Sequence, residues 1–265
     1  MTCRRGNRLP AVLAGRRPIF VAYLPVGDPV CRAATPSLYA DCGVDIIEFG
    51  VADGPAVLDG PTVSASMRRA AEAGVRGALA AETIRAASTG VDAARVWMTY
   101  PTNTPDLLDW VLTAEVDGFL TPSSTAAGTG MERGLRKRGI CTIGFLSHAP
   151  TAAEVRRAAG CEGYVMVAAD DGVTGPRQAV RDDNGPLLRA LTRRGVSVPK
   201  LLGFGLTTGS HARRTVELGA GGVVVGSACI RAAQQGEGDL RRLLTEIRAG
   251  LDEGREQAVG DGEHV

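Results

Sequence analysis

The stretch VDIIEFGVADGPAVLDGPTVSASMRRAAEA, Val44 to Ala73, contains one complete strand–loop–helix unit. Its first seven residues are a short β-rich run, and Thr62–Ala73 carries apolar residues at helical spacing. The same alternation recurs along the chain. Strands are predicted at Ile19–Pro25, Val44–Gly50, Val96–Tyr100, Gly118–Thr121, Thr142–Leu146, Gly163–Ala168, Leu201–Gly205 and Gly222–Gly226. Further helices are predicted at Gly77–Ala87, Thr151–Ala158 and Ser210–Leu218.

Eight β–α alternations predict an α/β fold, a (β/α)8 TIM barrel in a single domain, because parallel strands need crossover helices of this length. The 265 residues suit one such domain. An open doubly wound sheet is the alternative, but its G-x-G-x-x-G signature is missing after the first strand, which ends in YLPVGDP, Tyr23 to Pro29. The ends, residues 1–15 and 253–265, are expected to be loosely ordered.

The composition excludes several classes of protein. A net charge of +1 provides no field that would attract nucleic acid or an anionic membrane. No apolar run approaches the roughly 18–20 residues of a membrane span, and the opening residues do not resemble a signal peptide. Six scattered cysteines without a C-x-x-C pair indicate reduced thiols, so we expect a cytoplasmic protein without a zinc site.

Two acidic residues of the opening stretch are candidates for proton transfer. Alternation along the second strand directs Glu48 into the barrel lumen near the carboxyl end, where barrel active sites form. Apolar neighbours there are expected to raise its pKa towards neutrality. The alternative for Glu48 is a structural ion pair with an arginine. Asp59 lies just before a helix, so the alternative for Asp59 is helix capping.

Three glycine-rich turns predict a phosphate site. They are DGVTGP (Asp171–Pro176), GFGLTTGS (Gly203–Ser210) and GGVVVGSA (Gly221–Ala228), at the ends of strands six, seven and eight. Glycines let the backbone approach an anion, and free N–H groups at a helix start attract it. Barrels frequently bind phosphate after strands seven and eight. The alternative is that these turns are only helix caps.

Eight motifs together resemble the tryptophan synthase α subunit and its stand-alone relatives, the indole-3-glycerol phosphate lyases. In chain order they are FVAYLPVGDP from Phe20, IIEFG from Ile46, WMTY from Trp97, VDGF from Val116, HAPT from His148, GVTG from Gly172, GFG from Gly203 and VVGSA from Val224. The resemblance implies a lyase of tryptophan biosynthesis that cleaves indole-3-glycerol phosphate to indole and glyceraldehyde 3-phosphate.

The resemblance also implies the roles of individual residues. Glu48 is expected to move protons at indole C3 and at the glycerol hydroxyl, and Asp59 to bind the indole N–H. The residues expected to hold the phosphate are Gly175, Gly205, Gly226 and Ser227, and the expected aromatic pocket walls are Tyr23, Tyr100, Tyr164 and Phe204. His148 replaces an apolar residue of the family: it is either a rim histidine bonded to backbone or an added acid–base or specificity group.

No cofactor is expected, because the protonated ring itself can accept the electron pair of the breaking bond. The lysines also argue against a Schiff base: Lys137 lies in a predicted helix, and Lys200 lies at the start of strand seven, on the opposite rim. The three histidines are too scattered for a metal site.

Several departures from the family pattern cluster around the barrel mouth. ADGPAVLDGP, Ala52 to Pro61, stands where the family has P-F-S-D-P-L-A-D-G-P in a loop that engages the β subunit. The other departures are Pro101 and Thr102 after strand three, Ser123 after strand four, Met166 in place of a tyrosine, and Ala169 and Asp170 in place of Ser-Arg. These changes put docking to a β subunit in doubt, and we expect a lyase that acts alone. The alternatives are a related barrel lyase or isomerase with another phosphorylated substrate, and a weakly catalytic partner of a β-type subunit.

Overall fold

The computed structural model describes residues 6–32, 34–54, 58–100, 104–122, 129–172 and 174–262, and within them eight parallel strands close into one barrel in chain order. The strands are β1 (Ile19–Pro25), β2 (Ile46–Gly50), β3 (Ala94–Met98), β4 (Gly118–Leu120), β5 (Cys141–Leu146), β6 (Val165–Ala168), β7 (Lys200–Gly203) and β8 (Gly222–Val225). The ring closes through β8, which pairs with β1. The (β/α)8 barrel predicted from the sequence is confirmed.

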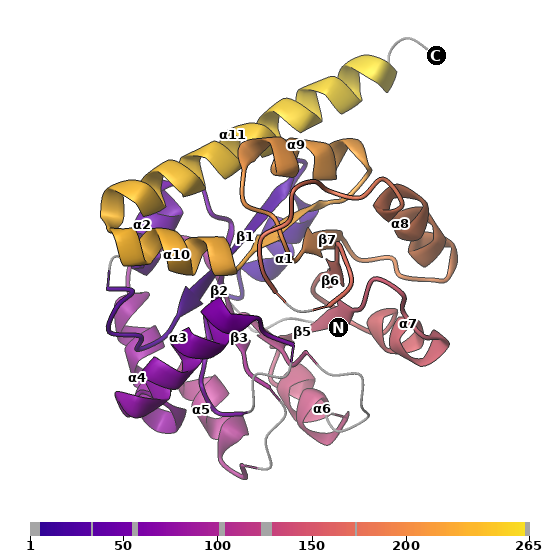
Figure 1. Cartoon of the computed structure of the whole chain (residues 1–265). Helices are drawn as coiled ribbons and strands as arrows, with labels where there is room; N and C mark the ends of the chain where they lie inside the picture. The colour runs from indigo at the N-terminus through magenta and orange to yellow at the C-terminus, as the bar shows by residue number, and fades with distance from the viewer. Residues whose placement is uncertain are drawn as a thin grey trace.

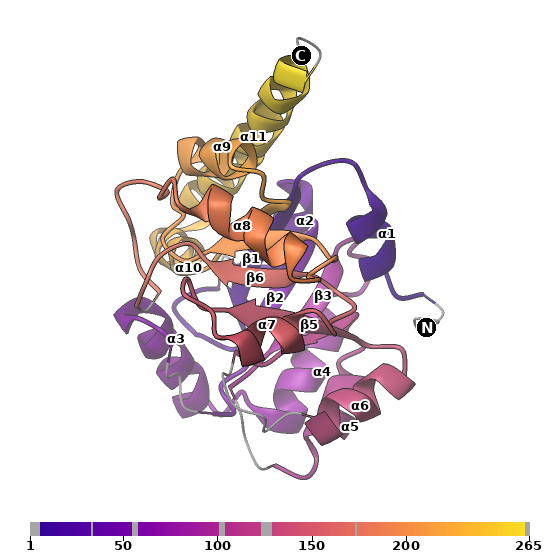
Figure 2. The same ribbon diagram turned by 90° about the vertical axis from the view of Figure 1, so that its right-hand side faces the viewer.

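Helices surround the barrel, as the view in Figure 1 shows. They are α1 (Leu9–Ala14), α2 (Pro36–Asp41), α3 (Pro61–Glu72), α4 (Gly77–Ala87), α5 (Leu107–Thr113), α6 (Thr129–Lys137), α7 (Ala152–Ala158), α8 (Asn184–Arg193), α9 (Gly209–Glu217), α10 (Ser227–Gln235) and α11 (Glu237–Gly262). The long α11 packs against α9 and α10, and in Figure 2 its final turns project beyond the barrel. None of the helices in the described ranges is long and apolar enough to cross a membrane.

The amino-terminal end of the barrel is closed by α1. Leu9 is fully buried there, and the side-chain amide of Asn7 donates to the carbonyl oxygens of Asp117 and Gly139, each at 2.9 Å. The segments expected to be loose are 1–15 and 253–265. Residues 1–5 and 263–265 lie outside the described residues, and the remainder of these segments includes α1 and the last turns of α11.

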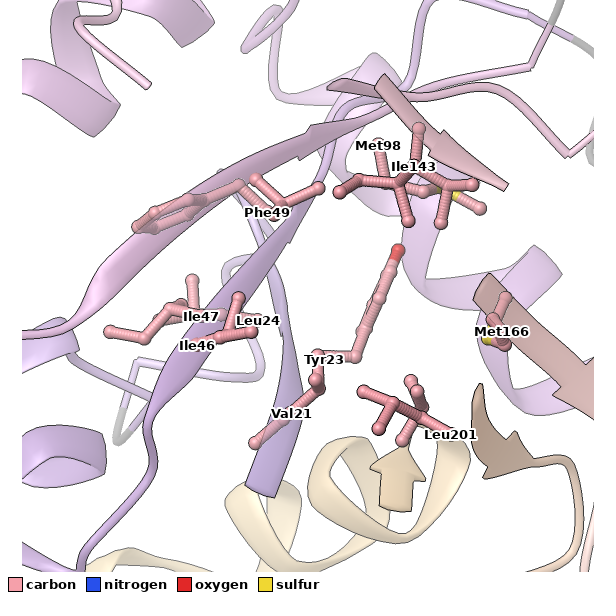
Figure 3. Packing of buried hydrophobic residues seen from close by; sticks show 14 of the residues in the cluster. Val21, Tyr23, Leu24, Ile46, Ile47, Phe49, Met98, Ile143, Met166 and Leu201 are labelled. Atoms are coloured by element: carbon pink, nitrogen blue, oxygen red, sulfur yellow. The ribbon is translucent and has the colours of Figure 1, made fainter. Parts of the chain in front are cut away.

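The lumen is filled by side chains that alternate along the strands. In Figure 3 Tyr23 and Met166 point into the barrel, whereas Ile47 and Phe49 lie on the other side of β2. Tyr23 on β1 is the register partner of Glu48 on β2. Closing one end with α1 and filling the interior with apolar side chains leaves the carboxyl ends of the strands as the open face, where the predicted site residues lie.

Candidate active site

A single pocket at the carboxyl ends of the strands brings together most of the predicted site residues. It encloses about 580 Å³, its open mouth included, which suits a small organic ligand. The lining residues are Tyr23, Glu48, Leu58, Asp59, Val63, Met98, Tyr100, Pro122, Phe145, Met166, Thr174, Phe204, Gly205, Leu206, Val224, Gly226 and Ser227. Three predicted residues, Tyr164, Gly175 and His148, do not line it.

Glu48 is held deep in this pocket by β2, and its side chain faces the lumen as predicted. The residue is 3% exposed, and the Tyr164 hydroxyl donates a hydrogen bond to its Oε2 at 3.4 Å. Among the described residues it forms no ion pair, so the arginine-paired alternative is not what the structure shows. Burial raises the pKa of Glu48 to about 8; the Tyr164 bond opposes this shift, and the charge of Asp59 adds to it.

Asp59 reaches the pocket from the loop between β2 and α3. The helix begins after Gly60, which caps it without any side-chain hydrogen bond, so Asp59 does not act as the cap. Its Oδ2 is buried and has no hydrogen-bond partner in the described part of the chain. Burial raises the pKa of Asp59 to about 6, although hydrogen bonds from Tyr100 and Thr174 oppose the rise. The pKa values of the two carboxyl groups are therefore raised to different extents, and that of Glu48 is the higher.

Thr174 joins the loop after β6 to the loop that carries Asp59. Its N–H donates to the Leu58 carbonyl at 3.2 Å, and its Oγ1 accepts from the Gly60 N–H at 2.8 Å. Neither Thr174 nor Leu58 was predicted from the sequence as a site residue. The signal for Thr174 was present in the GVTG motif, but the contact joins positions 114 residues apart.

Aromatic side chains form much of the remaining wall. Phe145 and Phe204 face each other with ring centroids 5.8 Å apart, and Tyr100 lies beside Asp59. Phe145 was not anticipated because strand alternation alone does not say which aromatic lies at the mouth. Flat aromatic walls next to two carboxyl groups suit a planar, partly polar ring system.

Part of the pocket wall is formed by backbone. Gly226 precedes α10 without a side-chain cap, so the N–H groups of its first turn, beginning at Ser227, are available to an anion. Gly205 lines the same pocket and has a φ of +89°. A Cβ at Gly205 would lie 2.2 Å from Cγ of Arg177, so glycine is required there. Gly175 follows Thr174 in the chain but does not itself line the pocket. Its contact with phosphate stays a prediction.

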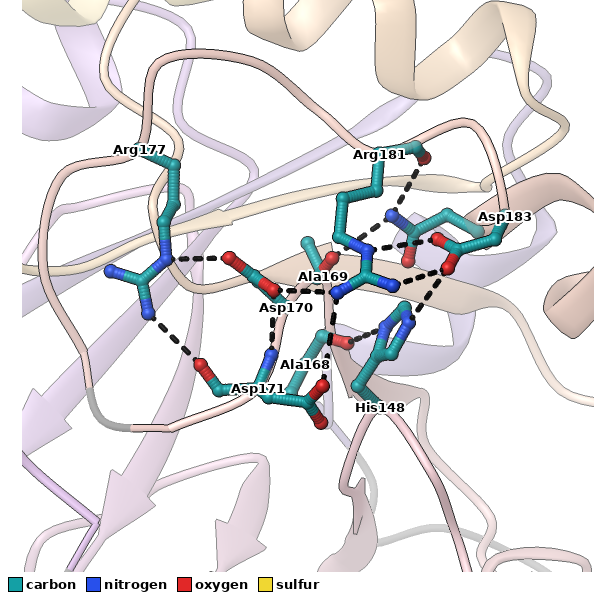
Figure 4. Close-up of polar contacts among 9 residues, drawn as sticks. His148, Ala168, Ala169, Asp170, Asp171, Arg177, Arg181 and Asp183 are labelled. Atoms are coloured by element: carbon teal, nitrogen blue, oxygen red, sulfur yellow. Dashed lines mark hydrogen bonds and ion pairs between the residues drawn. The ribbon is translucent and has the colours of Figure 1, made fainter.

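Figure 4 shows how the loop between β6 and α8 is held in place. Arg177 Nε lies 2.8 Å from Asp170 Oδ2, and Arg181 contacts Asp170 Oδ1 at 3.1 Å and Asp183 Oδ2 at 2.6 Å. We call Asp170, Arg177, Arg181 and Asp183 the loop clasp. Arg177 N–H also donates to the Gly205 carbonyl at 3.2 Å, which ties the clasp to the glycine turn of the pocket.

His148 belongs to the outer edge of this clasp. Its Nε2 lies 3.4 Å from Asp183 Oδ2, and its Nδ1 lies 3.3 Å from the Ala168 carbonyl oxygen. The contact with Ala168 fits the expected rim histidine bonded to backbone. A role of His148 in substrate binding stays a prediction.

Some sequence expectations cannot be placed. Pro101, Thr102 and Ser123, and residues 55–57 of the altered loop, lie outside the described residues. Across the described ranges, no group of three or more histidine, cysteine, aspartate or glutamate side chains is arranged to hold a metal ion.

Comparisons with known proteins agree on one family. The family model for the tryptophan synthase alpha chain matches residues 10–258. The chain is 32% identical to the tryptophan synthase alpha chain of Natronomonas pharaonis, over 92% of this chain and 95% of the relative. It is 29% identical to that of Methanosarcina acetivorans, over 87% and 88% respectively. A structure of tryptophan synthase from Mycobacterium tuberculosis superposes with a TM-score of 0.80 and 25% identity, covering 95% of this chain and 99% of that chain.

Proposed function

The chain belongs to the tryptophan synthase alpha chain family, lyases that cleave indole-3-glycerol phosphate to indole and glyceraldehyde 3-phosphate, and we propose that Glu48 and Asp59 carry out this reaction here. The observation that carries the assignment is that two carboxyl groups with different pKa values and a helix N-terminus line one pocket. The ring lies between the two carboxyl groups, and the phosphate binds at Gly205, Gly226 and Ser227.

The two pKa values divide the roles between the carboxyl groups. Glu48, with a pKa of about 8, is protonated at neutral pH and donates its proton to indole C3. Asp59, with a pKa of about 6, is ionised and accepts a hydrogen bond from the ring N–H, which stabilises the positive charge that C3 protonation creates. When their environments make the pKa values of two neighbouring carboxyl groups differ in this way, the group with the higher pKa commonly acts as the acid and the other as the anion.

In the cleavage step Glu48 acts as the base, because donation of its proton to C3 has left it as a carboxylate. The Glu48 carboxylate removes the proton of the hydroxyl on the glycerol carbon bound to C3. The O–H electron pair forms the aldehyde C=O bond, the C3–C bond breaks, and its electron pair returns to the ring, restoring neutral indole. Glu48 ends protonated, as it began, so the cycle is balanced without an added acid or base. Tyr164 acts on this step only through Glu48, as a positioning residue.

Release of indole from indole-3-glycerol phosphate by the purified chain tests the assignment. Glu48→Gln removes the transferable proton and should lower kcat by about 10² to 10⁴-fold. Asp59→Asn should lower it at least about tenfold, because a neutral amide cannot balance the ring charge. Asp53→Asn is the matched control: Asp53 lies on the same loop but binds Gly77 N–H, outside the pocket. No indole from the intact chain would favour another phosphorylated substrate.

We further propose that the chain is active without a β subunit. The loop clasp supports this, because contacts within the chain itself hold the loop after β6 against the Asp59 loop and the glycine turn. Turnover should therefore change less than about twofold when a β subunit of a relative is added, whereas partner-dependent closure typically moves kcat and KM together. Stimulation of tenfold or more would contradict the proposal.

We also propose a reducing compartment, the cytosol, as the place of the reaction. Cys31, Cys42, Cys141, Cys161 and Cys229 are free thiols, and Cys3 lies outside the described residues. Chains folded in oxidising compartments more often use their cysteines in disulfides.

A further inference from the structure

We propose that the Tyr23 hydroxyl takes direct part in the cleavage, by donating a hydrogen bond to the glycerol hydroxyl oxygen from which Glu48 removes the proton. This inference rests on the proposed function and adds a third polar group to its two carboxyl groups. The ring of Tyr23 forms part of the pocket wall. The geometry of its hydroxyl points to a more specific role.

Tyr23 projects from β1 into the lumen beside Glu48. The two residues are register partners on adjacent parallel strands, and both line the pocket. The ring lies over Gly50, where an added Cβ would fall 1.8 Å from the phenolic oxygen. The absence of a side chain at Gly50 therefore lets the hydroxyl extend past Glu48 towards the mouth. Figure 3 shows it directed into the lumen, towards the side that carries Met98 and Ile143.

This hydroxyl is buried and has no partner among the residues that the structure describes. Tyr23 is 3% exposed, and its oxygen has no hydrogen bond to any of the described residues. Most buried polar groups in folded proteins are paired, and an unpaired one is unfavourable enough to require an explanation. The other pocket hydroxyl from an aromatic ring, that of Tyr100, is bonded to Asp59. Tyr23 therefore offers an unused donor inside an otherwise largely apolar cavity.

The phenol remains a donor throughout the reaction. Burial, followed by the nearby charges of Asp59 and Glu48, raises the pKa of Tyr23 well above its ordinary value. It therefore does not compete with Glu48 as the base. Its chemical complement is an oxygen that gains negative charge, and the oxygen losing its proton to Glu48 is the one that does so as the C=O bond forms. A preorganised donor at such an oxygen stabilises the transition state more than the ground state.

Tyr23→Phe tests this role because it removes only the hydroxyl. The variant should release indole with kcat lowered about 10- to 100-fold and with KM raised by no more than about fivefold. Its Tm should equal or exceed that of the wild type, because an unpaired buried hydroxyl is lost. Tyr39→Phe is the matched control: its buried hydroxyl donates to the Tyr23 carbonyl at 2.9 Å, so its loss should lower Tm and leave kcat nearly unchanged.

A binding measurement separates hydrogen bonding from packing. 3-(Indol-3-yl)propyl phosphate keeps the ring and phosphate but lacks the glycerol hydroxyls. In a Glu48→Gln background, which prevents turnover, Tyr23→Phe should weaken binding of indole-3-glycerol phosphate about fivefold and leave binding of the propyl compound unchanged. Equal weakening of both ligands, or kcat within twofold of wild type, would overturn the inference. Absence of indole release from the wild type would instead contradict the proposed function itself.

Discussion

Replacing Tyr164 by phenylalanine should move the alkaline limit of activity to higher pH. Under the proposed mechanism activity requires Glu48 in its protonated form, so kcat/KM is expected to fall above the Glu48 pKa of about 8. The Tyr164 hydroxyl, 3.4 Å from Oε2, stabilises the carboxylate and so opposes the rise caused by burial. Without that donor the charged form is less stable, the pKa of Glu48 rises further, and the protonated form persists to a higher pH.

The size of the shift follows from the length of the hydrogen bond. A hydrogen bond to a charged group contributes about 1.5–3 kcal/mol, but its ordinary O–H···O length is about 2.5–3.0 Å. The 3.4 Å separation therefore indicates a weaker bond, of about 1 kcal/mol. One pKa unit corresponds to about 1.36 kcal/mol, so the alkaline limb should move upward by about 0.5–1 unit.

Indole release measured from about pH 5 to pH 10 at limiting substrate gives the profile of the free enzyme. The wild type should show a bell, with an acid limb near the pKa of Asp59, about 6, and an alkaline limb near that of Glu48, about 8. The limbs belong to the coupled pair of carboxyl groups, so both are fitted together. Tyr39→Phe, which removes a buried phenolic hydroxyl outside the pocket, should leave both limbs in place. An alkaline limb of Tyr164→Phe that stays fixed or moves downward would refute the reasoning.

Two further substitutions test the glycine turn and the loop clasp. Gly205→Ala combines a φ of +89° with a clash against Arg177, whereas the control Gly219→Ala has the same φ but open space around it. Gly205→Ala should therefore lower the free energy of unfolding, measured in urea, by about 1–3 kcal/mol more than Gly219→Ala. Equal losses in the two variants would contradict the close approach of Arg177 to Gly205. Asp170→Asn should raise KM and speed amide hydrogen exchange in residues 171–183, with global stability changed by less than about 1 kcal/mol because the ion pairs are partly exposed. Asp182→Asn, which breaks only an outer pair with Arg214, is its control, and unchanged exchange after Asp170→Asn would show that the clasp does not order the loop.

The periodicity of the sequence was sufficient for the barrel but not for every strand boundary. β1 has the predicted bounds, whereas β3 runs from Ala94 to Met98 rather than from Val96 to Tyr100. The start of β3 was missed because Arg95 is charged, and a charged residue argues against a buried strand. In the structure the Arg95 N–H donates to Asp117 Oδ2 at 2.9 Å, and the Arg95 guanidinium donates to the Ser88 carbonyl at 2.8 Å. Both partners come from other elements, so local pattern cannot reveal them.

β7 ends earlier than predicted for a different reason. Leu201–Gly205 reads as one strand, but β7 ends at Gly203 because Phe204 and Gly205 have φ of 69° and 89°. A phenylalanine in the left-handed region is uncommon, and no sequence pattern announces it. This turn brings Phe204 to the pocket wall and places the Gly205 carbonyl within reach of Arg177. The motif thus contains residues that line the pocket, while the backbone geometry of the turn depends on tertiary structure.

The pairing of charges in the loop clasp was likewise beyond the sequence. Acidic and basic residues are interspersed between positions 170 and 183, and their order permits several pairings. The structure selects Arg177 and Arg181 around Asp170, because the loop must turn back over the glycine turn after β7. The residue types show only that the loop contains charges of both signs, and the path of the backbone decides which of them meet.

Two carboxylates near opposite ends of β2 show how the barrel separates stability from chemistry. Asp45, just before the strand, accepts from the Phe20 N–H at 2.8 Å and contacts Arg17 at 2.7 Å and Arg248 at 3.2 Å. Glu48, three residues later, receives one long hydrogen bond from Tyr164. Pairing Glu48 as fully as Asp45 would stabilise its charged form and remove the proton that the proposed reaction needs. The carboxyl end of the strand therefore carries an acid with few hydrogen bonds among the described residues, whereas the carboxylate at the amino-terminal end is well paired and contributes to the stability of the fold.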